Sequence, residues 1–184
     1  MKYSNETVRR QDRLMDEHTA TELLMNSEYG ILSLTDKDGK AYGIPVNYVW
    51  DGKDSIYIHC APEGRKLQCM ANNPNVSFCV IGHTHLIPDK FTTEYESIIL
   101  RGKANIHLTD VEKMQALRGI LQKFSPDDTV VGEKYAAKSF HRVEIIRIDI
   151  TDWSGKCKHV HMRDWIARYP IRLRLLIKYQ LRIF

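Results

Sequence analysis

Three consecutive residues, Gly64, Arg65 and Lys66, combine the groups that bind a phosphate. They follow a predicted hairpin and stand where the sequence predicts the start of a short helix. Backbone N–H groups in a first helical turn have no partner within the helix, and the positive end of the helix dipole lies there. Two cationic side chains would add charge-assisted hydrogen bonds. We expect an anion site here, although an ordinary solvated helix start gives the same pattern. The aromatic residues of the hairpin favour a phosphorylated aromatic cofactor.

Several histidines offer further chemistry. His59 alternates with apolar residues in a predicted strand, so it is either a half-buried strand residue or a group that donates a proton near neutral pH. His83 and His85 lie on the same side of an extended segment. Two ligands seldom hold a metal ion, so we expect no metal site.

The cysteines argue against a zinc site. The chain has four, Cys60, Cys69, Cys79 and Cys157, and no two of them form a CxxC pair. Three fall inside predicted strands or helices, which favours reduced and mostly buried thiols. A reactive thiol at Cys60 would need a depressed pKa, for which the sequence gives no sign.

Composition indicates one folded domain with a substantial core. The chain has 184 residues, of which 43% are hydrophobic and 27% charged. No signal peptide or membrane-spanning apolar run is visible, so we expect a cytoplasmic protein. The formal net charge is +4, and the excess of basic residues falls after residue 158. The body therefore shows no electrostatic case for binding nucleic acid.

We expect residues 1–158 to form the domain and residues 159–184 to be a basic C-terminal extension of unknown role. Residues 171–184 partly alternate apolar and basic side chains. This segment fits an edge strand, an amphipathic helix on an acidic membrane surface, or an arm that binds a partner. Membrane contact through this extension is open but not favoured.

Hydrophobic periodicity predicts six strands, at residues 29–35, 42–50, 56–60, 76–81, 95–108 and 143–150, with a bulge at Arg101-Gly102. Helices are predicted at 19–27, after Gly64, at 109–123 and near 133–139, with Thr19 and Thr109 as caps; 83–93 reads as a loop. Short spacings between strands favour antiparallel pairing. We therefore expect a small, mainly β barrel with peripheral helices.

Short motifs along the chain resemble those of the FMN-binding split-barrel superfamily typified by pyridoxamine 5'-phosphate oxidase, and above all its nitroimidazole-resistance group. They are Arg9-Arg10, Asp12-Arg13, Gly30, Pro45-Val46-Asn47-Tyr48, Ile56-Tyr57-Ile58-His59, Glu63-Gly64-Arg65-Lys66, Asn73-Pro74, Tyr95-Glu96-Ser97, Arg101-Gly102 and Trp153-x-Gly155-Lys156. The likeness covers roughly residues 8–158. Two features depart from it: Cys60 stands where many relatives have glycine, and the C-terminal Arg/His substrate motif of the true oxidases is not visible.

The resemblance implies a six-stranded antiparallel split β-barrel that forms a homodimer with FMN at the subunit interface. It implies flavin contacts from Pro45, Val46, Asn47 and Tyr48 along the ring, and from His59, Cys60 and Ala61 beside the ring and ribityl chain. Gly64, Arg65 and Lys66 would hold the phosphate. Tyr95 and Ser97 would close the site, from the same subunit or from the other.

The expected function is that of an FMN-dependent oxidoreductase that reduces a small acceptor such as a nitroimidazole, with His59 on the substrate side. NAD(P)H or another reductant would supply the electrons. No glycine-rich dinucleotide fingerprint is present, so a nicotinamide would bind only transiently. The alternative is a non-catalytic flavin- or haem-binding protein of the same fold, acting as a sensor or carrier.

Overall fold

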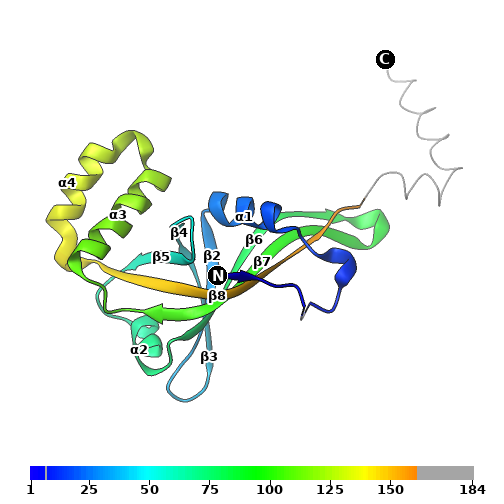
Figure 1. Ribbon diagram of the computed structural model, residues 1–184, viewed down its shortest axis with the longest axis horizontal. Coiled ribbons are helices and arrows are strands. Elements are labelled where there is room, and N and C mark those ends of the chain that lie inside the picture. Colours follow the sequence, from blue (N-terminus) through cyan, green and yellow to red (C-terminus); the bar gives the residue numbers. More distant parts are fainter. Residues whose placement is uncertain (7, 161–184) are drawn as a thin grey trace, which may run out of the picture.

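The computed structural model describes residues 1–6 and 8–160, so most of the basic extension predicted at 159–184 lies outside the described residues. In the described part, eight strands form one sheet in the order β3-β2-β6-β7-β8-β5-β4, with β1 added to β8 (Figure 1). They are β1 (Lys2–Tyr3), β2 (Tyr29–Thr35), β3 (Ala41–Asn47), β4 (Val49–Trp50), β5 (Ser55–Cys60), β6 (Asn75–Ile87), β7 (Thr92–Asn105) and β8 (Glu144–Lys158). Every pairing is antiparallel except that of β1 with β8.

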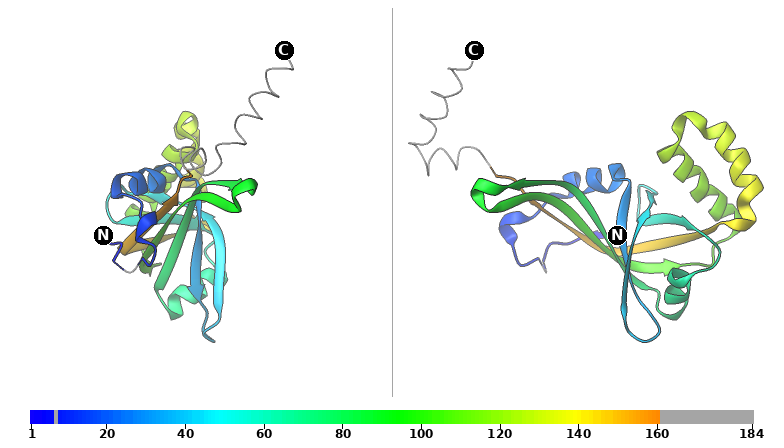
Figure 2. Two further views of the ribbon diagram at one scale, coloured as in Figure 1. Left: turned by 90° about the vertical axis from the view of Figure 1, so that its right-hand side faces the viewer. Right: turned by 180° about the vertical axis from the view of Figure 1, so that it is seen from behind.

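Within the described residues, four α-helices lie around the sheet. They are α1 (Glu17–Asn26), α2 (Arg65–Asn72), α3 (Asp110–Phe124) and α4 (Thr129–Ser139). Figure 1 shows α3 and α4 side by side at one end of the molecule, and the β6–β7 hairpin extending from the other end. Figure 2 confirms that this hairpin projects beyond the rest of the sheet. No helix in the described ranges has the length and apolar character needed to cross a membrane.

The main core fills the inside of the curled sheet. Its largest fully buried side chains include Trp153, Tyr48 and Phe78, packed with isoleucines and leucines from β2, β5, β7 and β8. A smaller cluster on the outer side of β8 joins Ile145 to Ala116 and Leu117 of α3. Alternate side chains of β8 therefore pack into two apolar layers, one inside the barrel and one under α3.

The predicted mainly β fold with peripheral helices is confirmed, but the number of strands differs. The strand expected at 42–50 is divided at Tyr48 into β3 and β4, and a two-residue β1 is added. The bulge predicted at Arg101-Gly102 is confirmed by a register shift between β7 and β8. A side chain at Gly102 would collide with the Asp149 carbonyl, which explains the glycine there.

Three other expectations are wrong. Residues 83–93 are not a loop: β6 continues to Ile87, and only a short turn separates it from β7. Asp16, not Thr19, caps α1, because the Asp16 carboxylate accepts from the Thr19 N–H at 2.9 Å. The helix predicted near 133–139 begins earlier, at Thr129, and is α4. Thr109 does cap α3, as predicted, by accepting from the Glu112 N–H.

All four cysteines are free thiols, as expected. Only Cys69 is buried, whereas Cys60, Cys79 and Cys157 are half-buried, so the expectation of mostly buried cysteines is wrong.

Candidate functional site

The start of α2 has the backbone conformation of an anion site. Gly64 caps the helix with φ 139°, a region that side chains rarely adopt, and the position a Cβ would take is open space. No side chain caps the helix. The first turn therefore presents uncapped N–H groups, together with the positive end of the helix dipole.

Arg65 is held at this helix start by two neighbours. Its guanidinium donates to Asp36 at 3.1 Å and lies 4.4 Å from the centre of the Tyr42 ring. Asp36 also accepts from the N–H groups of Lys40 and Asp38. These backbone bonds, followed by the Arg65 guanidinium, lower the pKa of Asp36, so it stays ionised and orients Arg65. More than half of the Arg65 side chain remains exposed.

Cys60 lies beside Lys66 and has an unreactive thiol. Cys60 packs against the barrel core at the end of β5. Burial raises the pKa of the Cys60 thiol, and the Lys66 charge opposes this shift only in part. The thiol therefore stays protonated at neutral pH and offers a small, neutral surface next to the helix start.

An open groove of about 410 Å³ runs along α2 from the same point. Gly64 and Leu67 line one side of it, and Ile106, His107 and Glu144 line the other. The groove gives space for the part of a ligand that extends past an anion bound at the helix start.

The end of β3 lies next to β5, so the sheet brings two predicted segments together. β3 contacts β5 where the barrel closes, and β4, which continues β3, pairs with β5. Because Val49 pairs with Tyr57 in antiparallel register, residues 45–48 and residues 59–61 extend from this pair toward the same end of the sheet, and α2 begins four residues after Ala61. Pro45 and Asn47 are exposed on β3, and Asn47 donates to the Glu28 carbonyl at 3.1 Å.

The predicted side chains in this group divide between two faces: Val46, Tyr48 and Cys60 pack toward the core, whereas Pro45, Asn47 and His59 are exposed. Tyr48 is fully buried and donates to the Leu24 carbonyl at 2.6 Å, which leaves only its backbone for a ligand. Burial raises the pKa of Tyr48. His59 is exposed and pairs with Ile145, whose side chain packs under α3. His59 and Cys60 thus lie on opposite faces of β5.

Tyr95 and Ser97 lie apart from the other predicted residues within one chain. They are on β7, and β2 and β6 separate that strand from β3. Three strand spacings correspond to about 14 Å. Ser97 pairs with Ile81 of β6, and Tyr95 lies at the base of the projecting hairpin.

Sequence reasoning missed two charged residues near these positions. One is Asp36, which orients Arg65 across a separation of 29 residues. Lys123, at the end of α3, donates to the Ser27 carbonyl at 2.6 Å and lies 4.3 Å from the centre of the Tyr48 ring. Burial lowers the pKa of Lys123. Both contacts join residues far apart in the sequence, so no local pattern signals them.

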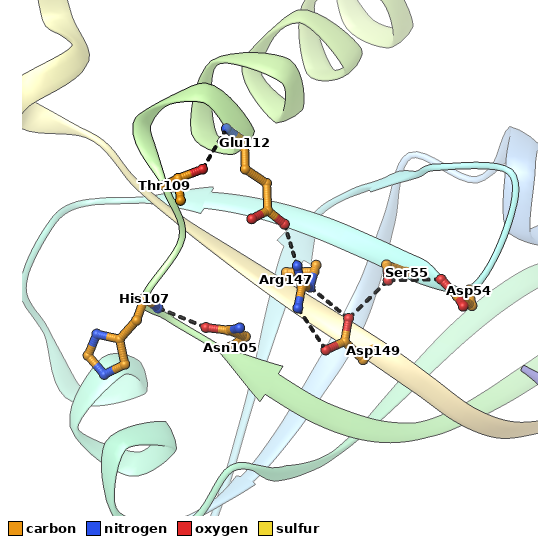
Figure 3. A network of polar contacts seen from close by, with 8 residues as sticks. All are labelled: Asp54, Ser55, Asn105, His107, Thr109, Glu112, Arg147 and Asp149. Carbon is orange, nitrogen blue, oxygen red and sulfur yellow. Dashed lines mark hydrogen bonds and ion pairs between the residues drawn. The ribbon is translucent and has the colours of Figure 1, made fainter.

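A second polar cluster connects α3 to the sheet (Figure 3). Arg147 of β8 donates to Glu112 at 2.5 Å and to Asp149 at 3.1 Å, and Ser55 donates to Asp149 at 3.0 Å. These partners raise the pKa of Arg147. Because both carboxylates share the one guanidinium, the cluster is a closed network that holds α3 in place rather than a site for a ligand.

Comparisons with known proteins agree with this architecture. A family model described as pyridoxamine 5'-phosphate oxidase matches residues 16–157. A similar solved structure is that of a candidate 5-nitroimidazole antibiotic resistance protein from Bacteroides thetaiotaomicron, at 21% identity and a TM-score of 0.64, covering 79% of this chain and 86% of that chain. The FAD and heme binding protein from Mycobacterium smegmatis has 18% identity and a TM-score of 0.69, covering 83% of this chain and 78% of that chain.

The heme storage protein HutZ from Vibrio cholerae is also similar, at 15% identity and a TM-score of 0.56, covering 75% of this chain and 90% of that chain. No curated protein matches the sequence. The structural agreement with these proteins establishes a shared fold, which is the split barrel that the motifs predict. At identities of 15–21%, it establishes the fold alone.

Proposed function

The chain belongs to the pyridoxamine 5'-phosphate oxidase family, and from this premise we propose that it binds a flavin, FMN, with the phosphate at the start of α2. The observation that carries the proposal is the uncapped helix start at Gly64, with the Arg65 guanidinium held against Asp36 and Tyr42 and the Lys66 charge acting on Cys60 of β5. A terminal phosphate monoester fits this site because it can accept several N–H groups and two cationic donors at once.

The flavin ring would then lie toward the junction of β3 and β5. Backbone groups of residues 45–48 would bind its polar edge, and Cys60 and Ala61 would flank the ring and ribityl chain. His59 is exposed like Pro45 and Asn47, whereas the Cys60 side chain packs toward the core, so we assign His59 to the substrate side, where an exposed imidazole can donate a proton.

A homodimer would complete this site. Within one chain, the two strands β2 and β6 lie between β3 and the strand that carries Tyr95 and Ser97. A second copy would bring these two residues to the flavin. The outer face of β2, β6 and β7 supports this arrangement, because Tyr29, Ile81 and Ile99 are 53%, 49% and 41% exposed there. Ser97 and Ile99 share this face, as alternate residues of a strand do.

The activity we propose is reduction of a small acceptor, with a nitro-aromatic compound as the candidate. The Bacteroides thetaiotaomicron neighbour, named for 5-nitroimidazole resistance, supports that choice of acceptor. Bound FMN would supply the redox chemistry, and NAD(P)H would supply the electrons. The chain would position the flavin and, through His59, provide a proton to the reduced acceptor.

The second candidate function is binding of haem or flavin without turnover. Its support is that two similar structures are named for heme, one as a binding and one as a storage protein. Purified protein with a Soret band and without flavin bands would favour this candidate over the first.

The test compares ligands with and without the phosphate. The purified full chain is titrated with FMN and with riboflavin, and binding is followed by the quenching of flavin fluorescence. We expect tighter binding of FMN, and at least tenfold weaker FMN binding in Lys66→Ala with riboflavin affinity unchanged, because only the phosphate contact is lost. Lys53→Ala, which removes an exposed lysine from the turn before β5, serves as the control.

Equal affinities for FMN and riboflavin in the wild-type protein would contradict the phosphate site. Turnover is then measured on FMN-loaded protein with NADPH and a nitroimidazole under anaerobic conditions. His59→Ala should slow consumption of the acceptor while leaving the affinity for FMN unchanged. Loaded protein that takes electrons from NADPH but passes none to the acceptor would identify a carrier.

A further inference from the structure

The projecting β6–β7 hairpin carries a cluster of metal-ligating side chains. His83 and His85 of β6 and Glu94 of β7 each offer one ligand atom, and these atoms all lie within 4.8 Å of one another. In the sequence, His83 and His85 are only two ligands, so a metal site was not expected. Pairing of β6 with β7 adds the missing third ligand, because His85 lies directly opposite Glu94.

From this geometry we propose that His83, His85 and Glu94 bind a divalent transition-metal ion of the Zn²⁺ class. Two imidazoles and one carboxylate are a ligand set that Zn²⁺ accepts, with water in the fourth position. Tetrahedral Zn²⁺ with bonds of about 2.0–2.1 Å places neighbouring ligand atoms about 3.3 Å apart. The distance between His85 Nδ1 and Glu94 Oε2 is 3.2 Å, so this edge already has the required length.

Glu94 is prepared for this role by its other oxygen. Glu94 Oε1 accepts the Val160 N–H at 2.6 Å, which fixes the carboxylate and leaves Oε2 facing His85. This backbone bond, followed by His85, lowers the pKa of Glu94, so the carboxylate is ionised at neutral pH. Hydrogen bonds that orient a ligating carboxylate are common around protein metal sites.

The surroundings carry charges of both signs and are open to water, and Lys158 of β8 donates to Thr92, two residues before Glu94. Glu96, two residues along β7, lies 3.7 Å from His159 at the edge of the cluster and adds a second carboxylate. Both histidines of β6 are exposed, so an ion can reach the site and keep bound water. As an ordinary cross-strand ion pair, His85 and Glu94 would contribute little stability, because such exposed pairs are screened by solvent.

The proposed metal site does not share side chains with the proposed flavin site. Successive residues of a strand point to opposite faces, so Glu94 and Glu96 face away from Tyr95 and Ser97. Failure of flavin binding would leave the metal proposal untouched, and the reverse also holds.

The test uses tag-free full-length protein freed of metal with a chelator. Titration with Zn²⁺ by calorimetry should show about one ion per chain. Binding of Co²⁺ should give visible absorption without a thiolate-to-metal band, which separates this site from one built on the four cysteines. His83→Ala, His85→Ala and Glu94→Gln should each weaken binding at least tenfold. Glu94→Gln retains the oxygen that accepts from Val160, so it removes the charge with little change of shape.

His18→Ala is the matched control. His18 and Glu22 are an exposed histidine–carboxylate pair on α1, with His18 Nδ1 3.9 Å from Glu22 Oε2. Among the described residues, no second histidine joins this pair to form a group of three potential metal ligands. This variant should bind Zn²⁺ like the wild type. The circular dichroism spectrum and melting temperature of each variant check that it is folded. Absence of Zn²⁺ binding by the wild type, or equal binding by the three variants, would overturn the proposal.

Discussion

The ring of Tyr48 lies in the core, and its hydroxyl group hydrogen-bonds to the last turn of α1. The last carbonyls of an α-helix lack partners within the helix. Tyr48 supplies one of these partners, because it donates to Leu24 near the end of α1. The same residue divides β3 from β4, so one side chain sets the distance between α1 and the corner of the barrel.

Replacement of Tyr48 by Phe should lower the free energy of unfolding by about 1–2 kcal/mol, because the buried Leu24 carbonyl loses its donor while the ring remains. Urea unfolding measures the loss. Tyr135→Phe is the control: its side chain is 66% exposed, and the change should stay within about 0.5 kcal/mol. Equal stability of wild type and Tyr48→Phe would mean that water replaces the hydroxyl group.

Single residues also show where sequence reasoning succeeds and fails. Gly64, Arg65 and Lys66 could be recognised because helix-start chemistry depends on neighbours in the sequence. Asp36 could not, because it reaches Arg65 across a separation of 29 residues. The inward position of Tyr48 follows from its alternation with Val46, but its hydroxyl partner on α1 depends on tertiary packing alone.

At the scale of elements, periodicity predicts β2 residue for residue because its buried and exposed positions alternate along its whole length. Residues 83–93, the tip of the β6–β7 hairpin, read as a loop in the sequence because the segment from His83 to Leu86 projects from the core and is exposed on both faces. A strand without a buried face leaves no period-2 signal in its sequence. For the same reason, the third metal ligand could not be inferred before the register was known.

The network around Arg147 makes its own prediction for the packing of α3. Arg147→Met should lower the free energy of unfolding by about 2 kcal/mol, because Glu112 and Asp149 lose a charged partner in a half-buried setting. Urea unfolding again gives the value. Arg118→Met breaks the exposed pair between Arg118 of α3 and Glu133 of α4 and should cost at most about 0.5 kcal/mol. Similar losses in the two variants would show that Arg147 contributes only surface charge.

At the scale of the whole molecule, the exposed apolar face of β2, β6 and β7 predicts the oligomeric state. Ile99→Lys places a charge in the middle of this face, so it should convert a dimer into a monomer and weaken FMN binding with it. Light scattering after size-exclusion chromatography gives the mass. Val111→Lys, at a position 69% exposed on α3, is the control and should leave the mass unchanged. A wild-type protein that is monomeric at every concentration would refute the shared site.

The position of β8 has a consequence for how the chain is made. β8 is the last strand in the described chain, yet it lies between β7 and β5 and also pairs with β1. During translation, β5 and β7 therefore emerge with one edge each unpaired, and the barrel cannot close before Lys158 has left the ribosome. Unpaired edges invite association with other chains. Nascent chains stalled before this strand should thus depend on chaperones. In a chain that includes β8, this strand pairs with the open edges of β5 and β7.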